Sequence, residues 1–226
     1  MTARRLPVLV LLAAGLVCSF LGVRLLVADI FAWQASRFVA DWSQRGEVAS
    51  DRAWLVAETA ARRAIGVTPV ATAIHYERLG RIYEWRDLNL PLGNPDAEQS
   101  RVAARDAYRR TLELRPLWPY TWARLAYVKL RLLQIDDEFD EALRQAVALG
   151  PWRVNVNKTV AEIGLIAWLE LDGSQRTLVL EATERTLVLN RRAGQQVMAL
   201  AARFHRVDDV CAALDREVAE ARKVCQ

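Results

Sequence analysis

The feature that most constrains the fold of this chain is a phrase that recurs around two prolines. The segments LELRPLW and VALGPWR place Pro116 and Pro151 35 residues apart, each after a run with helical spacing of apolar residues. Proline cannot continue a helix, so each one marks the end of a helix or the start of the next. A period near 35 residues is typical of a repeated helical hairpin. We therefore predict an all-α protein whose antiparallel helix pairs stack as an α-solenoid.

The residues between the prolines fit the tetratricopeptide pattern, which places an aromatic residue, a leucine and a small residue on the first helix of each pair. These positions are taken by Tyr76, Leu79 and Gly80, then by Trp122, Leu125 and Ala126, and in a weaker third unit by Ile163 and Gly164. The small residue lets paired helices approach closely. The best repeats are predicted at about 73–116 and 117–151, with an insertion after Trp85 in the first.

The first 28 residues differ from the rest of the chain. Between Leu6 and Ala28 the only charged side chain is Arg24, and about 20 apolar residues suffice to cross a bilayer. The apolar side chains of this segment include Leu6, Leu12, Leu16, Leu21 and Val27. A cleaved secretory signal is the alternative, but the apolar run is long for one and no clear cleavage site follows it. We predict an uncleaved signal anchor over residues 1–28.

The charges that flank this anchor predict its orientation. Arg4 and Arg5 precede it and Asp29 follows it, so the positive-inside rule leaves the N-terminus in the cytoplasm. The remainder would then face the periplasm, with the anchor in the inner membrane. The chain has 31 Lys and Arg and 27 Asp and Glu, and three of the basic residues precede Asp29. The exported part is therefore nearly neutral, which excludes an electrostatic argument for nucleic acid binding.

Helical periodicity continues beyond the anchor. The residues that share one face there are Phe31, Ala35, Phe38, Val39 and Trp42. This face predicts that the anchor helix extends to about Gln44, as a juxtamembrane stalk within residues 29–49, and that the helical-repeat domain occupies 50–226. Later helices are predicted to open at Thr68–Pro69, to be capped by Ser174, and to run unbroken from Asp208 to Val224.

No motif in the chain predicts a catalytic residue, a cofactor or a metal site, so we expect a protein that is not an enzyme. The two histidines, His75 and His205, have no partners at zinc spacing, and no phosphate-binding glycine loop occurs. The acidic run from Asp136 to Glu141 fits either a cation or catalytic site, or a helix N-terminus with acids in its first turn. We favour the helix N-terminus, because the alternating ligands and glycine of a calcium loop are missing.

Aromatic residues gather near the joints between the predicted repeats. Trp118, Tyr120, Trp122 and Trp152 could contact a protein partner or stack on the sugar rings of a glycan. The alternative is that they fill space between repeats, as the pattern requires of Trp122.

Two cysteines lie in the part of the chain predicted to be exported, where a disulfide can form. A straight helix would hold Cys211 and Cys225 about 21 Å apart, whereas a disulfide requires Cα atoms within about 7 Å. They can pair only if the segment between them folds back, and both states remain open.

Four segments together resemble the VpsP-type polysaccharide biosynthesis proteins. These segments are YERLGRIYEW, YRRTLELRPLWPYTWARLAYVKL, DEFDEALRQAVALGPWRVNV and IGLIAWLEL, and they cover about Tyr76 to Leu171. The WPYTW and LGPW phrasing is also similar to the tetratricopeptide-like tails of O-antigen ligase and polymerase relatives. The resemblance implies an accessory or scaffold role in exopolysaccharide production and carries over no catalytic residue.

From these features we expect a membrane-anchored scaffold that binds proteins of polysaccharide polymerisation or export. The alternatives are a module that binds the polysaccharide directly through its aromatic residues, an adaptor for another cell-envelope system, or an enzyme that uses the acidic run.

Overall fold

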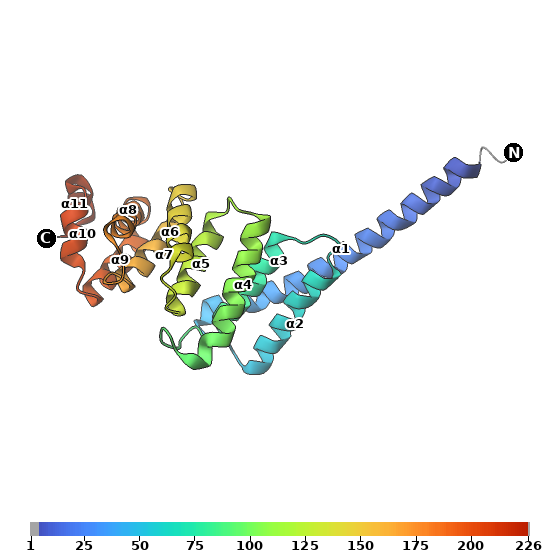
Figure 1. Ribbon diagram of the computed structural model, residues 1–226, viewed down its shortest axis with the longest axis horizontal. Coiled ribbons are helices and arrows are strands. Elements are labelled where there is room, and N and C mark those ends of the chain that lie inside the picture. Colours follow the sequence, from blue (N-terminus) through green and yellow to red (C-terminus); the bar gives the residue numbers. More distant parts are fainter. Residues whose placement is uncertain (1–4, 226) are drawn as a thin grey trace. The chain divides into compact units, whose positions relative to one another are not determined.

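The computed structural model describes residues 5–225 of the chain (Figure 1). Over that range the protein forms eleven α-helices and one 3-10 helix, without a β-strand. The prediction of an all-α fold behind a long apolar N-terminal helix is confirmed. The chain divides into two compact units, Met1–Asn89 and Leu90–Gln226.

The first unit contains α1 (Arg5–Arg45), α2 (Asp51–Val67) and α3 (Ala73–Arg86). Helices α2 and α3 lie along the second half of α1 (Figure 1). The residues of α1 that this packing buries are Ala28, Ala32, Ala35, Val39 and Trp42. The three alanines recur at helical spacing and lack bulk, so they permit the close approach of a neighbouring helix. The stalk is therefore one continuous helix with the apolar segment, and it forms part of a three-helix unit.

The first half of α1 has no helix beside it within its unit, and apart from Ser19 its described exposed side chains are apolar. Leu12, Leu16 and Leu21 are exposed and Val27 is half-buried, whereas the described side chains begin only at Leu9. The side chains of Arg5 and Leu6, and the whole of Arg4, lie outside the described part. By length and composition α1 can cross a membrane.

The second unit is a row of paired helices. Its elements are the 3-10 helix Pro95–Ala97, α4 (Glu98–Leu114), α5 (Pro119–Arg131), α6 (Asp137–Leu149), α7 (Val154–Ile166), α8 (Gly173–Leu189), α9 (Arg191–Arg203), α10 (Val207–Ala213) and α11 (Arg216–Arg222). Helix α5 packs on α6, and α7 packs on α8. The first helices of these pairs, α5 and α7, also contact each other, as do the second helices, α6 and α8. This layered arrangement of pairs is that of an α-solenoid.

Residues that fit the tetratricopeptide pattern lie where the helices of a pair pack together. The predicted repeat 117–151 coincides with α5 and α6, and Leu125 and Ala126 are buried there. In the third unit, a Cβ atom on Gly164 would lie 2.0 Å from Cγ2 of Val179, so α7 and α8 meet where Gly164 has no side chain. The predicted repeat 73–116 comprises α3 and α4, which belong to different compact units.

Two predicted helix starts differ from the structure because polar side chains bond to other backbone groups. Helix α3 begins at Ala73, not at Pro69, because Thr68 closes α2: its N–H and its hydroxyl both donate to the carbonyl oxygen of Ala64. Helix α8 is capped by Asp172 rather than Ser174. Asp172 accepts from the backbone N–H of Gln175, and the Gln175 side chain accepts from the N–H of Asp172, both at 2.8 Å.

The C-terminal segment folds back instead of forming one helix. Helix α10 ends at Ala213, and Asp215 caps the start of α11 by accepting from the backbone N–H groups of Glu217 and Val218. This break brings the Cα atoms of Cys211 and Cys225 to 5.6 Å, and the two residues form a disulfide. No side chain of α11 is fully buried, and the disulfide restrains this segment together with contacts to α8, where Arg222 donates to the carbonyl oxygen of Val188.

Candidate functional site

The joint between α4 and α5 holds a small stack of side chains. The ring centroids of Trp118 and Tyr120 are 5.3 Å apart, and the guanidinium carbon of Arg115 lies 3.6 Å from the centroid of Trp118. Both rings are half-buried. The rings therefore contact each other, and Arg115 covers part of Trp118, so this pair does not present two open faces to a sugar ring.

Trp122 forms a hydrogen bond within the same joint. Its Nε1–H donates to the carbonyl oxygen of Pro116 at 2.6 Å, and Pro119 occupies the first turn of α5. This hydrogen bond joins the start of α5 to the turn before it. Trp122 thus acts in the repeat, whereas Trp118 and Tyr120 line its joint.

Exposed apolar side chains recur at the joints between pairs. Leu117 and Trp152 each follow one of the two prolines, and they are 74% and 78% exposed. Val188, at the end of α8, lies 36 residues after Trp152 and is 45% exposed. Because two antiparallel helices separate one joint from the next, the three joints lie at the same end of the pairs. We call Leu117, Trp152 and Val188 the joint row.

Exposed arginines accompany the joint row. Arg115 precedes Leu117 by two residues, Arg153 follows Trp152, and Arg191 follows Val188 by three residues. Each joint therefore presents an apolar side chain with a nearby positive charge. Such a surface fits a partner that offers apolar side chains and carboxylates. Leu117 was not among the predicted contact residues, although it stands directly after Pro116 as Trp152 stands after Pro151, and this match could have identified it.

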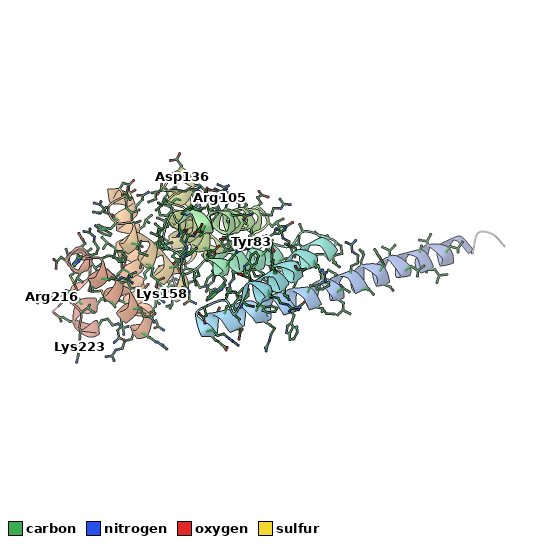
Figure 2. All side chains as sticks on the ribbon, turned by 90° about the horizontal axis from the view of Figure 1, so that it is seen from below. Tyr83, Arg105, Asp136, Lys158, Arg216 and Lys223 are labelled. Carbon is green, nitrogen blue, oxygen red and sulfur yellow. A yellow bond between two sulfur atoms is a disulfide. The ribbon has the colours of Figure 1, made fainter. Side chains whose placement is uncertain are left out.

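A polar cluster joins α4, α5 and α6 through ion pairs, and Figure 2 labels one of its members, Asp136. Lys129 is only 1% exposed, and its Nζ lies 2.8 Å from Oδ1 of Asp136 and 2.5 Å from Oε2 of Glu138. Arg109 of α4 donates to both carboxylate oxygens of Glu138 at 2.7 Å. A buried ammonium is tolerated when carboxylates and hydrogen bonds surround it, so this cluster is stable as a set. Nothing in the sequence spacing indicates it, because its members come from three helices.

The acidic run is thus held in structural contacts. Oδ1 of Asp136 accepts from the backbone N–H groups of Glu138 and Phe139 at 3.1 Å, as a helix N-cap does. Hydrogen bonds from Arg109 and then Lys129 lower the pKa of Glu138 to about 2, against the opposing effect of burial. Among the described residues, no group of three or more His, Cys, Asp or Glu side chains is placed to hold a metal ion.

The Glu138 contacts predict a specific dependence of stability on pH. Its pKa is lower in the folded chain, so its stabilising effect is complete above its usual pKa of 4.5 and is lost as pH falls toward 2. Wild type should lose stability as the pH falls through this range. After allowance for partial solvent exposure, we expect the free energy of unfolding of Glu138→Gln to fall by about 1–2 kcal/mol less than that of wild type. Urea unfolding followed by circular dichroism would measure it.

Asp137→Asn is the matched control for that experiment, because the exposed neighbour Asp137 makes none of these ion pairs. It should lose stability in acid as wild type does. Equal acid sensitivity of Glu138→Gln and wild type would contradict the role given to Glu138.

Comparisons with known proteins assign no family: no protein-family model and no curated protein matches the chain. The likeness to VpsP-type proteins therefore stays a prediction from motifs. The structural features that bear on function are the apolar half of α1, the helix pairs and the joint row.

Proposed function

We propose that the protein is a membrane-anchored adaptor whose helical-repeat unit binds a protein partner. The observation that carries this proposal is the continuity of α1, which joins an exposed apolar half directly to a folded half packed against α2 and α3. Such a helix can hold the folded units at a bilayer surface. Confinement to one membrane raises the effective concentration of the adaptor and a membrane partner.

The joint row supplies the contact surface in this proposal. Repeat arrays offer extended surfaces to partners, and large exposed apolar side chains rimmed by charge are typical of interaction sites. Trp and Arg are also the residue types most enriched among side chains that dominate binding energy. Trp152 and Arg153 combine these two residue types at one joint, and the neighbouring joint presents the exposed apolar side chain of Leu117 near Arg115.

We place this adaptor in exopolysaccharide biosynthesis, at the inner membrane, with a cytoplasmic N-terminus and the two folded units in the periplasm. The motif resemblance and the charges around the apolar segment support this assignment. The partners would be proteins of polymer assembly or export. An adaptor for another envelope system would use the same anchor and surface.

A photo-crosslinking amino acid at Trp152 or Leu117 would test the proposal in native membranes. We expect these positions to capture a component of polysaccharide polymerisation or export. A crosslinker at Asp137, an exposed residue at the start of α6 and so at the opposite end of that helix from Trp152, is the matched control and should capture it much less. Equal capture at Asp137, or capture of components of another envelope system alone, would contradict this assignment.

Direct glycan binding is the second candidate function, and the exposed ring of Trp152 is what favours it. Trp118 is partly covered by Arg115, and the N–H of Trp122 is bonded within the joint. Trp152 is therefore the aromatic most open to a sugar ring. Tryptophan fluorescence of the full-length chain titrated with the native polymer should respond in wild type and lose that response in Trp152→Ala. No response in wild type would exclude this function.

A further inference from the structure

Arg24 makes a contact that bears on how the first unit meets the membrane. Its Nε donates to the carbonyl oxygen of Val67 at 2.9 Å, and its Nη2 lies 3.5 Å from the carbonyl oxygen of Gly66. Both carbonyls belong to the last turn of α2, where helices leave carbonyl groups without N–H partners and carry partial negative charge. The end of α2 therefore satisfies the one positive charge that α1 carries near the end of its apolar half.

This contact places the connection between α2 and α3 next to the part of α1 that contains Arg24 (Figure 1). The side chains of α1 are exposed from Leu9 to Val23, and the first buried one is Ala28. Arg24 precedes Ala28 by one helical turn, about 6 Å along the axis. The residues that follow α2 therefore lie where the apolar half of α1 ends.

The connection at this level has the composition of a segment that meets lipid. From Ala64 to Ile74 there is no charged side chain, and Val70 and Ile74 are 75% and 50% exposed. Within it, Pro69 lacks an N–H and the N–H of Thr68 bonds to Ala64, so these two residues need no outside hydrogen-bond acceptor. In water these exposed apolar side chains are unfavourable, whereas at the edge of the hydrocarbon they are favourable.

The opposite end of the first unit is rich in charged residues. The connection between α1 and α2 is flanked by charged residues, namely Arg45, Glu47, Asp51 and Arg52. Since α2 returns along α1, the two connections lie at opposite ends of the unit. The unit is therefore apolar at the end near Arg24 and charged at the far end, as expected for a body that rests on a membrane at one end only.

Paired aromatic and basic side chains lie just beyond the apolar end. Trp33 is exposed with the guanidinium carbon of Arg37 5.8 Å from its ring centroid, and Arg63 stands 5.6 Å from the ring of Phe31. Tryptophan and arginine are the residues that favour the headgroup region, where an apolar body and a polar tip are both satisfied.

We propose that residues 67–74, the interfacial loop, insert into the same leaflet from which α1 emerges, so that the first unit contacts the bilayer at a second place. The ligand of this site is the lipid bilayer itself. The inference rests on the proposed function only in requiring that α1 spans the membrane. Two attachments, α1 and the loop, fix the rotation of the first unit about the axis of α1.

Depth-dependent quenching on the full-length chain tests this inference. An environment-sensitive fluorophore is attached at Val70→Cys, at Glu47→Cys and at Leu16→Cys, each in a Cys18→Ser background with the Cys211–Cys225 disulfide intact. The chains are reconstituted in vesicles of phosphatidylcholine and phosphatidylglycerol. Quenching is then compared between aqueous iodide and lipids that carry a nitroxide on the acyl chain.

We expect the label at Val70 to resemble the label at Leu16, with strong quenching by nitroxide lipids and severalfold weaker quenching by iodide than at Glu47. Iodide quenching at Val70 equal to that at Glu47, with Leu16 still quenched by lipid, would overturn the loop and leave the anchor intact. Protection of Val70 from both quenchers would also overturn it, because protein rather than lipid would cover the loop. Failure of lipid quenching at Leu16 would instead overturn the anchor.

Discussion

Replacing Gly164 with alanine is expected to destabilise the α7–α8 pair by about 2–3 kcal/mol. A Cβ atom at this position would lie 2.0 and 2.5 Å from the two γ carbons of Val179 and 2.7 Å from its Cβ. Rotation of the Val179 side chain moves the γ carbons but not the Cβ. The two helices would therefore have to separate, which opens the core between them. The gain in helix propensity from alanine, about 1 kcal/mol, is too small to compensate.

The measurement is chemical unfolding of the full-length chain, together with hydrogen exchange of the α7 and α8 peptides. Gly173→Ala is the matched control in the same pair, because no atom lies within 4 Å of a Cβ built there. It should be neutral or slightly stabilising. The double variant Gly164→Ala with Val179→Ala should recover only part of the loss, since the Cβ of residue 179 remains. Full stability of Gly164→Ala would show that the helices do not meet at this glycine.

Gly164 also shows why the helix pairs could be predicted from sequence. Its role follows from a period and a residue size, since a small residue recurs at the position where paired helices touch. The prolines at 116 and 151 similarly mark joints, because proline limits the backbone locally. These signals are local in sequence. The all-α fold, the pairing of helices and the repeat 117–151 could therefore be predicted from the sequence alone.

The features that the sequence did not predict depend on contacts between distant residues. Lys129 is buried because Asp136 and Glu138 both pair with it, and Glu138 is held in turn by Arg109 of α4. Arg24 bonds to the carbonyl oxygen of Val67, 43 residues away, a contact that its place in the apolar segment does not indicate. The helix break at Leu214–Asp215, which permits the disulfide, was missed because that segment contains neither glycine nor proline.

Loss of the indole of Trp42 is expected to have the largest effect in the first unit, about 3–5 kcal/mol for Trp42→Ala. Trp42 is completely buried, and its ring centroid lies 5.9 Å from that of Phe38 and 6.4 Å from that of Trp85. Because Trp85 belongs to α3, this packing holds α3 against the last turns of α1. Hydrogen exchange in the α3 peptides should increase in Trp42→Ala, while the apolar half of α1 remains unchanged.

Phenylalanine at two positions separates ring packing from hydrogen bonding. Among the described residues, none accepts a hydrogen bond from Nε1–H of the buried Trp42, so Trp42→Phe removes an unfavourable donor along with part of the ring. Trp54 donates its Nε1–H to the carbonyl oxygen of Ile82 at 2.9 Å, so Trp54→Phe loses a hydrogen bond worth about 1 kcal/mol. Chemical unfolding should therefore find Trp54→Phe the more destabilised of the two. The reverse order would mean that the N–H of Trp42 is bonded in the folded protein.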